Sequence, residues 1–307
     1  MSQTLHLLTG PTGVGKSALA LAWARAHGAE ILSCDALQVY RGMDIGTAKP
    51  GAAERAEVPH HGLDLCDPAQ PYSVAAYRDY AARVVAEIHA RGRAVLVAGG
   101  SGFYLKCFFA PVADDIFIPA SIEDEVRALE KSGGLPALVA RLHAASPAGT
   151  GKVDLRNPRR VARALARCLA SGRSVPELAA AFARSGTPFD RWEKRLVRLE
   201  RAPEDLLERI RARTRQMFAS GLIEEVRTLT DALRANLAAA SAIGYRETLA
   251  WLDAGGKTPL VELEERIVLH TAQLVRKQRT WFRTQLPQHR VIHLTEAPAA
   301  DAGNLFA

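Results

Sequence analysis

The sequence contains few cysteines and no pattern that would gather them into one site. Four occur in 307 residues (Cys34, Cys66, Cys107 and Cys168), and no two of them have the CxxC spacing of metal or redox motifs. We therefore expect reduced, mostly buried thiols, because neither their number nor their spacing matches a zinc site or a disulfide framework.

Long apolar stretches are absent as well. No run of about 18 apolar residues occurs, which excludes a conventional transmembrane helix. The opening residues MSQTLHLLTG lack the basic and apolar regions of a signal peptide. We therefore expect the protein to be cytoplasmic. The composition, with 48% hydrophobic and 24% charged residues, is ordinary for a globular enzyme.

The positive charge is concentrated in one part of the chain. The net charge is +7, yet residues 1–110 hold 10 Lys and Arg against 9 Asp and Glu. Residues 152–173 hold seven basic residues and a single acidic one. Such a cluster is typical of a surface that binds a polyanion, although a solvated helix face has the same composition.

The first 110 residues alternate between strand and helix patterns. Short apolar runs predict strands over 4–8, 29–33 and 93–100. Helices are expected over 15–28, ending at Gly28, and over 71–92, with Ser73 as a possible cap and Gly92 as the stop. This alternation predicts an α/β fold with a parallel sheet flanked by helices.

The pattern then changes to helices without convincing strands. Residues 114–190 contain helical segments separated by Pro and Gly, after which 195–200 predicts a returning strand. Helices follow over 203–221, 222–235 and 259–285, and residues 290–294 could close the sheet. We therefore expect a core domain of 1–113 and 191–307, interrupted by an all-helical insertion domain of 114–190.

Between the first strand and the first helix lies GPTGVGKS, a match to the GxxxxGK[ST] phosphate loop in its required context. Its glycines allow backbone N–H groups to surround oxyanions, and the helix N-terminus and lysine add positive charge. The serine hydroxyl is a candidate ligand for Mg²⁺. The expected diphosphate-binding residues are Gly10, Thr12, Gly13, Val14, Gly15, Lys16 and Ser17.

The phosphate loop does not identify the reaction. It could hold ATP while a phosphoryl group moves, or a diphosphate that departs while a carbon fragment moves. None of the three predicted strands in the first 100 residues ends in the aspartate of a Walker-B metal site. The second strand runs instead into Asp35, at a carboxyl end where α/β active sites lie, so Asp35 is either a general base or a turn residue.

Further segments of the sequence are highly specific. They include SCDALQVYRGMDIGTAKP, VPHHGLDLCDPAQPYSVAAYR, VLVAGGSGFYLK, NPRRVARAL, ERIRARTRQM, GLIEEV, AIGYRE and RKQRTWFR. With these motifs the chain resembles the tRNA dimethylallyltransferase (tRNA isopentenyltransferase) family nearly from end to end. The resemblance implies a P-loop NTPase-like fold and transfer of a dimethylallyl group from dimethylallyl diphosphate to N6 of the adenosine 3′ of the anticodon.

The resemblance also implies roles for individual residues. Asp35 would be the catalytic base, and the phosphate loop with Mg²⁺ would hold the leaving diphosphate, with Thr12 and Lys16 in contact with it. The flipped adenosine would meet Asp35, Ala36, Leu37 and Gln38, with Ser101 near both substrates. The tRNA would contact Arg159, Arg160 and Arg163 of the basic helix, and we expect the protein to act as a monomer.

The chain departs from the family pattern in several places, which concern tRNA contacts more than the reaction. The departures are Ala36 for Ser, Ser101 for Thr, Asn157 for Asp, Ala166 for Glu, Ala272 for Arg and Leu274 for Tyr.

The sequence leaves three alternative functions open. A small-molecule P-loop kinase would use ATP, and an adenylate isopentenyltransferase would act on free nucleotides without a basic insertion. A non-catalytic RNA-binding protein would keep a relic loop.

Two further pairs of residues invite a functional interpretation. Adjacent His60 and His61 have no Cys or carboxylate partners at ligand spacing, so we expect a structural role rather than a metal site. Trp281 and Phe282 lie on an amphipathic pattern and are expected in the core rather than as platforms for base stacking.

Overall fold

The computed structural model of the protein describes residues 3–113, 116–294 and 304–306. The chain divides into two compact units. The core unit consists of Met1–Ala110 and Pro188–Ala307, and the insertion unit of Pro111–Thr187. The second unit begins and ends three residues before the insertion domain expected from the sequence. Among the described helices, none is long and apolar enough to cross a membrane.

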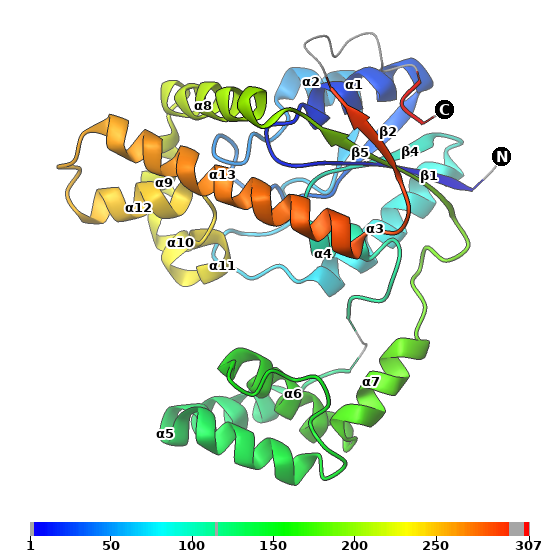
Figure 1. Cartoon of the computed structure of the whole chain (residues 1–307), viewed down its shortest axis with the longest axis vertical. Helices are drawn as coiled ribbons and strands as arrows, with labels where there is room; N and C mark the ends of the chain where they lie inside the picture. The colour runs from blue at the N-terminus through cyan, green and yellow to red at the C-terminus, as the bar shows by residue number, and fades with distance from the viewer. Residues whose placement is uncertain (1–2, 114–115, 295–303, 307) are drawn as a thin grey trace. The chain divides into compact units, whose positions relative to one another are not determined.

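The core unit is built on a six-stranded sheet (Figure 1). The strands lie in the order β3-β2-β4-β1-β5-β6, and every neighbouring pair is parallel. The expected parallel sheet is thereby confirmed; β3, with two residues, is too short to show a sequence period. The bounds are β1 Thr4–Thr9, β2 Ala29–Ser33, β3 His60–His61, β4 Ala94–Ala98, β5 Glu193–Glu200 and β6 Arg290–His293.

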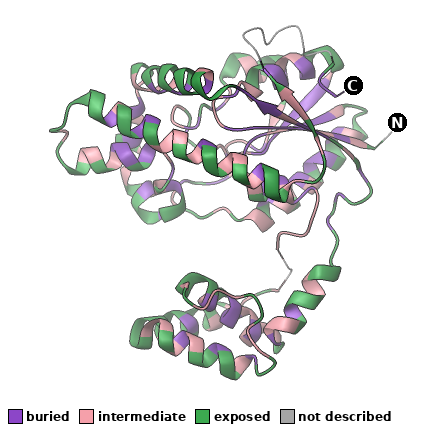
Figure 2. Cartoon of the chain, in the orientation of Figure 1, coloured by how far each residue is buried: buried purple, intermediate pink, exposed green. Residues whose placement is uncertain are grey.

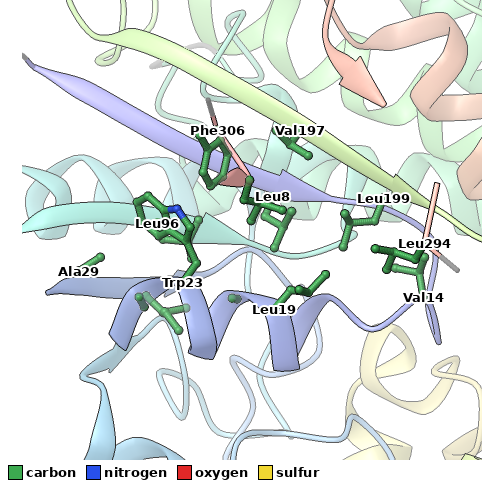
Figure 3. Packing of buried hydrophobic residues seen from close by; sticks show 14 of the residues in the cluster. Leu8, Val14, Leu19, Trp23, Ala29, Leu96, Val197, Leu199, Leu294 and Phe306 are labelled. Atoms are coloured by element: carbon green, nitrogen blue, oxygen red, sulfur yellow. The ribbon is translucent and has the colours of Figure 1, made fainter. Parts of the chain in front are cut away.

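Helices cover both faces of this sheet (Figure 1). Leu8 and Leu96 belong to the cluster that packs on α1 (Lys16–His27), which contributes Leu19 and Trp23 (Figure 3). The residues next to Leu8 and Leu96 in these strands point to the opposite face of the sheet and are also buried. This burial on both faces explains why the strands are continuous apolar runs in the sequence. Figure 2 shows the same division, with buried strands and exposed outer faces on the surrounding helices.

The remaining helices of the core unit come before and after the insertion. Ser73 caps α3 by accepting the Ala76 N–H at 3.1 Å, as expected. The prediction of a single helix over 222–235 is wrong, because Leu229 separates two short helices there. The bounds are α2 Ala52–Glu57, α3 Val74–Ala90, α4 Gly102–Lys106, α8 Pro203–Ala219, α9 Leu222–Thr228, α10 Thr230–Ala235, α11 Leu237–Ala240, α12 Tyr245–Asp253 and α13 Leu260–Gln285.

The insertion unit is helical and has its own hydrophobic core. It contains α5 (Ala120–Ala145), interrupted at Gly134, with α6 (Pro158–Ser171) and α7 (Val175–Arg184). Asn157 caps the N-terminus of α6, because its side chain accepts the Arg160 N–H. The apolar face of α6 packs into the core of the unit, which leaves Arg159, Arg160 and Arg163 exposed.

A carboxylate from the C-terminal half of the chain holds the turn at residues 44–46. Glu225 accepts the backbone N–H groups of Asp44, Ile45 and Gly46 at 3.0, 2.7 and 3.2 Å. It also accepts a hydrogen bond from the fully buried Tyr245 hydroxyl. The motifs DIGTAKP, GLIEEV and AIGYRE, far apart in the sequence, therefore meet in one hydrogen-bonded cluster.

Lys49 anchors the other end of the same turn to Tyr40 and Asp64. Its buried ammonium donates to Tyr40 O at 2.7 Å and to Asp64 Oδ1 at 2.6 Å. Burial alone would raise the pKa of Asp64, but hydrogen bonds from Lys49 and Arg55 outweigh burial and lower it. The turn that carries Gly46 and Thr47 is therefore fixed at both ends.

We expect Gly46→Ala to lower the free energy of unfolding by about 1–3 kcal/mol, the usual range for overpacking. A Cβ at this position would lie 2.4 Å from the Tyr245 ring, which is itself completely buried. Thermal and chemical denaturation of the variant measure the loss. The matched control is Gly51→Ala, whose Cβ would have Glu54 Oε2 at 3.9 Å as its nearest neighbour; equal stabilities of the two variants would contradict the argument.

Candidate active site

The phosphate loop connects the end of β1 to the start of α1. Gly10 has φ +151°, and a Cβ there would lie 2.6 Å from the Leu199 carbonyl oxygen, so this position requires glycine. Gly13 and Gly15 also have positive φ. The loop thus delivers the N-terminus of a 12-residue helix, with its unpaired N–H groups and positive dipole end, to one place.

Lys16 folds back over the loop that precedes it. Its ammonium donates to the carbonyl oxygens of Gly10 and Pro11, both at 2.8 Å. Burial lowers the pKa of Lys16 to about 8, while the negative charge of Asp35 opposes that change. No carboxylate among the described residues forms an ion pair with Lys16, so its charge remains available to an anion.

Asp35 lies two residues beyond the end of β2, and the adjacent loop after β4 supports it. Its Oδ1 accepts the Leu37 N–H at 2.9 Å, so it does stabilise a turn, while Oδ2 has no hydrogen-bond partner among the described residues. The Ala36 N–H donates to Ser101 Oγ at 2.8 Å. One carboxylate oxygen therefore fixes the orientation of Asp35, and the other is available for proton transfer.

Two arginines of α8 reach the phosphate loop from the C-terminal half of the chain. Arg209 donates to Gly13 O at 3.0 Å and Arg213 to Thr12 Oγ1 at 3.3 Å. Burial lowers the pKa of Arg213, opposed by the charge of Asp35, and its Nε has no partner among the described residues. A guanidinium without a carboxylate partner in such a position favours an anionic ligand.

These groups surround a cavity of about 550 Å³, called here the polar cavity. Its walls combine the helix N-terminus with three cationic side chains. The residues lining it are Thr12, Gly13, Gly15, Lys16, Ser17, Ala18, Asp35, Gln38, Thr47, Ala48, Glu54, Ala98, Gly99, Gly100, Arg209, Ala212, Arg213 and Gln278.

A second cavity of about 590 Å³, called here the apolar cavity, lies next to it. Its volume is typical of ligand sites, and aliphatic and aromatic side chains make up much of its wall. The residues lining it are Thr12, Gly13, Asp35, Ala36, Leu37, Gly46, Thr47, Gly100, Ser101, Gly102, Phe103, Tyr104, Ile210, Arg213, Thr214, Met217, Ile243, Ile267, Thr271, Leu274, Lys277, Gln278, Trp281 and Phe282.

Seven residues line both cavities and so mark the seam between them: Thr12, Gly13, Asp35, Thr47, Gly100, Arg213 and Gln278. The carboxylate that could take a proton and the arginine that could hold an anion lie together at this seam. The arrangement accommodates an anion on one side and an apolar or aromatic group on the other, with Asp35 between them.

The structure brings most of the sequence-predicted residues to these cavities. Gly10 and Val14 line neither: Gly10 packs against Leu199, and Val14 is buried in the sheet core, where its carbonyl accepts the Arg201 Nε–H. Arg159, Arg160 and Arg163 are exposed on α6 of the insertion unit.

Sequence reasoning missed Arg209, Arg213 and Gln278 as site residues. The arginines are four residues apart in ERIRARTRQM, a spacing that places both on one helix face and could have revealed them. Gln278 lies in the motif RKQRTWFR, but nothing in that motif indicates which groups the Gln278 side chain contacts.

The expectation of reduced, mostly buried cysteines agrees with the structure. All four cysteines are free and buried. His60 and His61 form β3, where His61 Nε2 lies 2.7 Å from Glu30 Oε2, and the described residues contain no cluster of three or more potential metal-binding side chains. Phe282 is fully buried, as expected, but Trp281 is half-buried and lines the apolar cavity, so the core prediction is wrong for Trp281.

Comparison with known families identifies the group to which these features belong. The model of a family described as IPP transferase matches residues 38–285. The chain belongs to the IPP transferase family. The match covers the 44–46 turn, α8 and α13 as well as the insertion unit.

Several relatives are similar to this chain over most of their length. A tRNA dimethylallyltransferase of Opitutus terrae is 53% identical over 303 residues, covering 98% of this chain and 96% of that protein. One from Rhodococcus jostii is 41% identical over 288 residues, covering 92% and 90%. The crystal structure of a tRNA isopentenylpyrophosphate transferase from Bacillus halodurans has a TM-score of 0.67 at 31% identity, covering 96% and 91%.

We expect the affinity for an alkyl diphosphate ester to fall as the pH rises through about 8. Lys16 carries its charge below this pKa and loses it above, while the ester stays fully ionised. Isothermal titration calorimetry between about pH 7 and 9.5 measures the change. In Lys16→Arg the guanidinium remains charged throughout, so the pH dependence should disappear; an identical pH profile in this variant would exclude Lys16 as its source.

Proposed function

We propose that the chain transfers a dimethylallyl group from dimethylallyl diphosphate to N6 of the adenosine 3′-adjacent to the anticodon of tRNA. The products are N6-dimethylallyladenosine and diphosphate. The observation that carries the proposal is the position of Asp35 at the seam between a cationic cavity and an apolar one. We further propose that the protein works in the cytoplasm as a monomer.

The polar cavity supplies the site of the leaving group. As the allylic C–O bond breaks, negative charge develops on the diphosphate, and the charges of Lys16, Arg209 and Arg213 would stabilise it together with the α1 N-terminus. These groups are held by hydrogen bonds to the phosphate loop itself, so little reorganisation accompanies the reaction.

The acceptor approaches from the apolar cavity. Its exocyclic amine attacks the allylic carbon as the bond to diphosphate breaks, and the proton lost from N6 passes to Asp35. The free Oδ2 of Asp35 suits this role, because Oδ1 is already engaged by the Leu37 N–H. Tyr104, Trp281 and Phe282 give the cavity the aromatic walls that an extruded base requires.

The residues present are compatible with Mg²⁺. Ser17 is exposed at the start of α1, lines the polar cavity, and its hydroxyl has no hydrogen-bond partner among the described residues. Because the described residues place no acidic cluster beside Ser17, the ion would take its other ligands from water and phosphate oxygens, as Mg²⁺ commonly does. When bound, it supplies further positive charge to the departing diphosphate.

The insertion unit offers a surface for the RNA backbone. Arg159, Arg160 and Arg163 are exposed on α6, and none pairs with a carboxylate among the described residues. The relatives from Opitutus terrae and Rhodococcus jostii are both tRNA dimethylallyltransferases. A free nucleotide would need no such surface, which favours tRNA over adenylate as the acceptor.

The proposal is tested by incubating the protein with tRNA, Mg²⁺ and dimethylallyl diphosphate, followed by nucleoside analysis of the tRNA. We expect N6-dimethylallyladenosine and one diphosphate released for each group transferred. A parallel reaction replaces the donor with ATP. Consumption of the γ-phosphate without prenylation would support a kinase instead.

We expect Asp35→Asn to slow prenyl transfer by roughly 10²–10⁴-fold, the range for loss of a general base. The amide keeps an oxygen for the Leu37 N–H, so the turn should persist. Single-turnover rates measure the effect. Asp67→Asn is a matched control, because Asp67 Oδ1 also accepts an N–H two residues on, at 2.9 Å, on an exposed turn. A near-normal rate in Asp35→Asn would remove Asp35 from the mechanism.

For tRNA binding, we expect Arg160→Ala/Arg163→Ala to weaken affinity and flatten its salt dependence. Each lost phosphate contact should reduce the slope of log affinity against log salt by about 0.7 on single strands and 0.9 on duplex. Filter binding at several salt concentrations measures both quantities. Arg127→Ala/Arg141→Ala on α5 is the control, since these arginines already pair with Asp124 and Glu125; equal slopes in wild type and the α6 variant would make α6 an ordinary surface.

A further inference from the structure

Gln278 connects two loops that approach the cavities from different strands. Its Oε1 accepts the Thr12 N–H at 3.0 Å, and its Nε2 donates to the Gly100 carbonyl at 3.2 Å. These two partners determine the orientation of the side-chain amide. The Thr12 N–H requires an acceptor, which must be Oε1, and the Gly100 carbonyl requires a donor, which must be Nε2. One side chain thereby bridges the phosphate loop after β1 and the loop after β4.

The bridge continues as far as Asp35. Gly100 is followed by Ser101, whose Oγ accepts the Ala36 N–H at 2.8 Å, and Ala36 is the neighbour of Asp35. Thr12, Gln278, Gly100, Ser101 and Ala36 thus form a continuous connection between the proposed diphosphate site and the proposed base. Both ends of this connection, Thr12 and Asp35, lie at the seam of the two cavities.

The bridging amide has little freedom to move. Four residues after it, Phe282 is fully buried, and Arg279 anchors the helix through Glu200 Oε2 at 3.0 Å and Arg201 O at 2.8 Å. A Cβ on Gly100 would lie 3.0 Å from Gln278 Nε2, so the two loops enclose the amide closely. Helix α13 therefore holds Gln278 at a fixed place relative to the sheet.

We propose that Gln278 is a positioning residue for the transfer, setting the separation between the diphosphate-holding loop and Asp35. This inference rests on the proposed function. Displacement at the allylic carbon requires the departing oxygen, the carbon and the attacking nitrogen to be aligned, and a misplacement of about 1 Å can cost 10²-fold in rate. Gln278 acts through Thr12 N–H and Gly100, while Lys16, Arg209 and Arg213 still hold the diphosphate.

We expect Gln278→Ala to reduce kcat by about 10–100-fold and to change KM for either substrate by less than about threefold. Gln278→Glu keeps the acceptor for Thr12 N–H but loses the donor to Gly100, so it should not restore kcat. The matched control is Gln273→Ala, which removes an exposed glutamine from the same helix. Melting temperatures of all three variants show whether the fold is retained.

A double-mutant cycle separates positioning from a general loss of structure. If Gln278 and Ser101 act as parts of one connection, Gln278→Ala combined with Ser101→Ala should lose little more rate than the more damaging single change. Rate losses that multiply would show two independent effects and overturn the inference. An unchanged kcat in Gln278→Ala would overturn it as well.

The outcome distinguishes this inference from the proposed function. If wild-type protein fails to prenylate tRNA with dimethylallyl diphosphate, the proposed function is wrong. If wild type transfers the group and Gln278→Ala does so at the same kcat, only the positioning role is wrong. A raised KM for the donor with unchanged kcat would make Gln278 a donor-binding residue instead.

Discussion

Parallel pairing of the central strands is the constraint on which the rest of the site depends. In the order β2-β4-β1, all three strands run in the same direction, so their carboxyl ends meet at one edge of the sheet. The loops that follow them carry Asp35, Ser101 and the phosphate loop. An antiparallel neighbour would send one of these loops to the far edge, and the proposed base and the proposed diphosphate site could not share a seam.

The site also depends on cations that remain unpaired. Elsewhere in the core unit, buried charges have partners, as Lys49 has with Asp64 and Arg201 with Asp205. Lys16 and Arg213 have none among the described residues, although burial lowers the pKa of both. Their charges are costly to keep without a partner, and a diphosphate ligand would offset that cost.

The sequence predicts local features of this fold well and long-range contacts poorly. The phosphate loop, the strand that delivers Asp35 and the cap at Ser73 follow from patterns within a few residues. The closure of the site by Arg213 and Gln278 could not be predicted in this way, because each meets Thr12 from about 200 or more residues away. The break at Leu229 was missed for a related reason, since the expected helix has continuous helical periodicity and tertiary contacts decide where it ends.

The hydrogen bonds that hold the 44–46 turn constrain the order in which parts of the molecule can fold. The turn belongs to the first sixth of the chain, but Glu225 and Tyr245, which hold it, are translated much later. The wall provided by Gly46 and Thr47 lacks its support until α12 has left the ribosome. The seam of the two cavities is therefore assembled last, when the final third of the chain folds back onto the first.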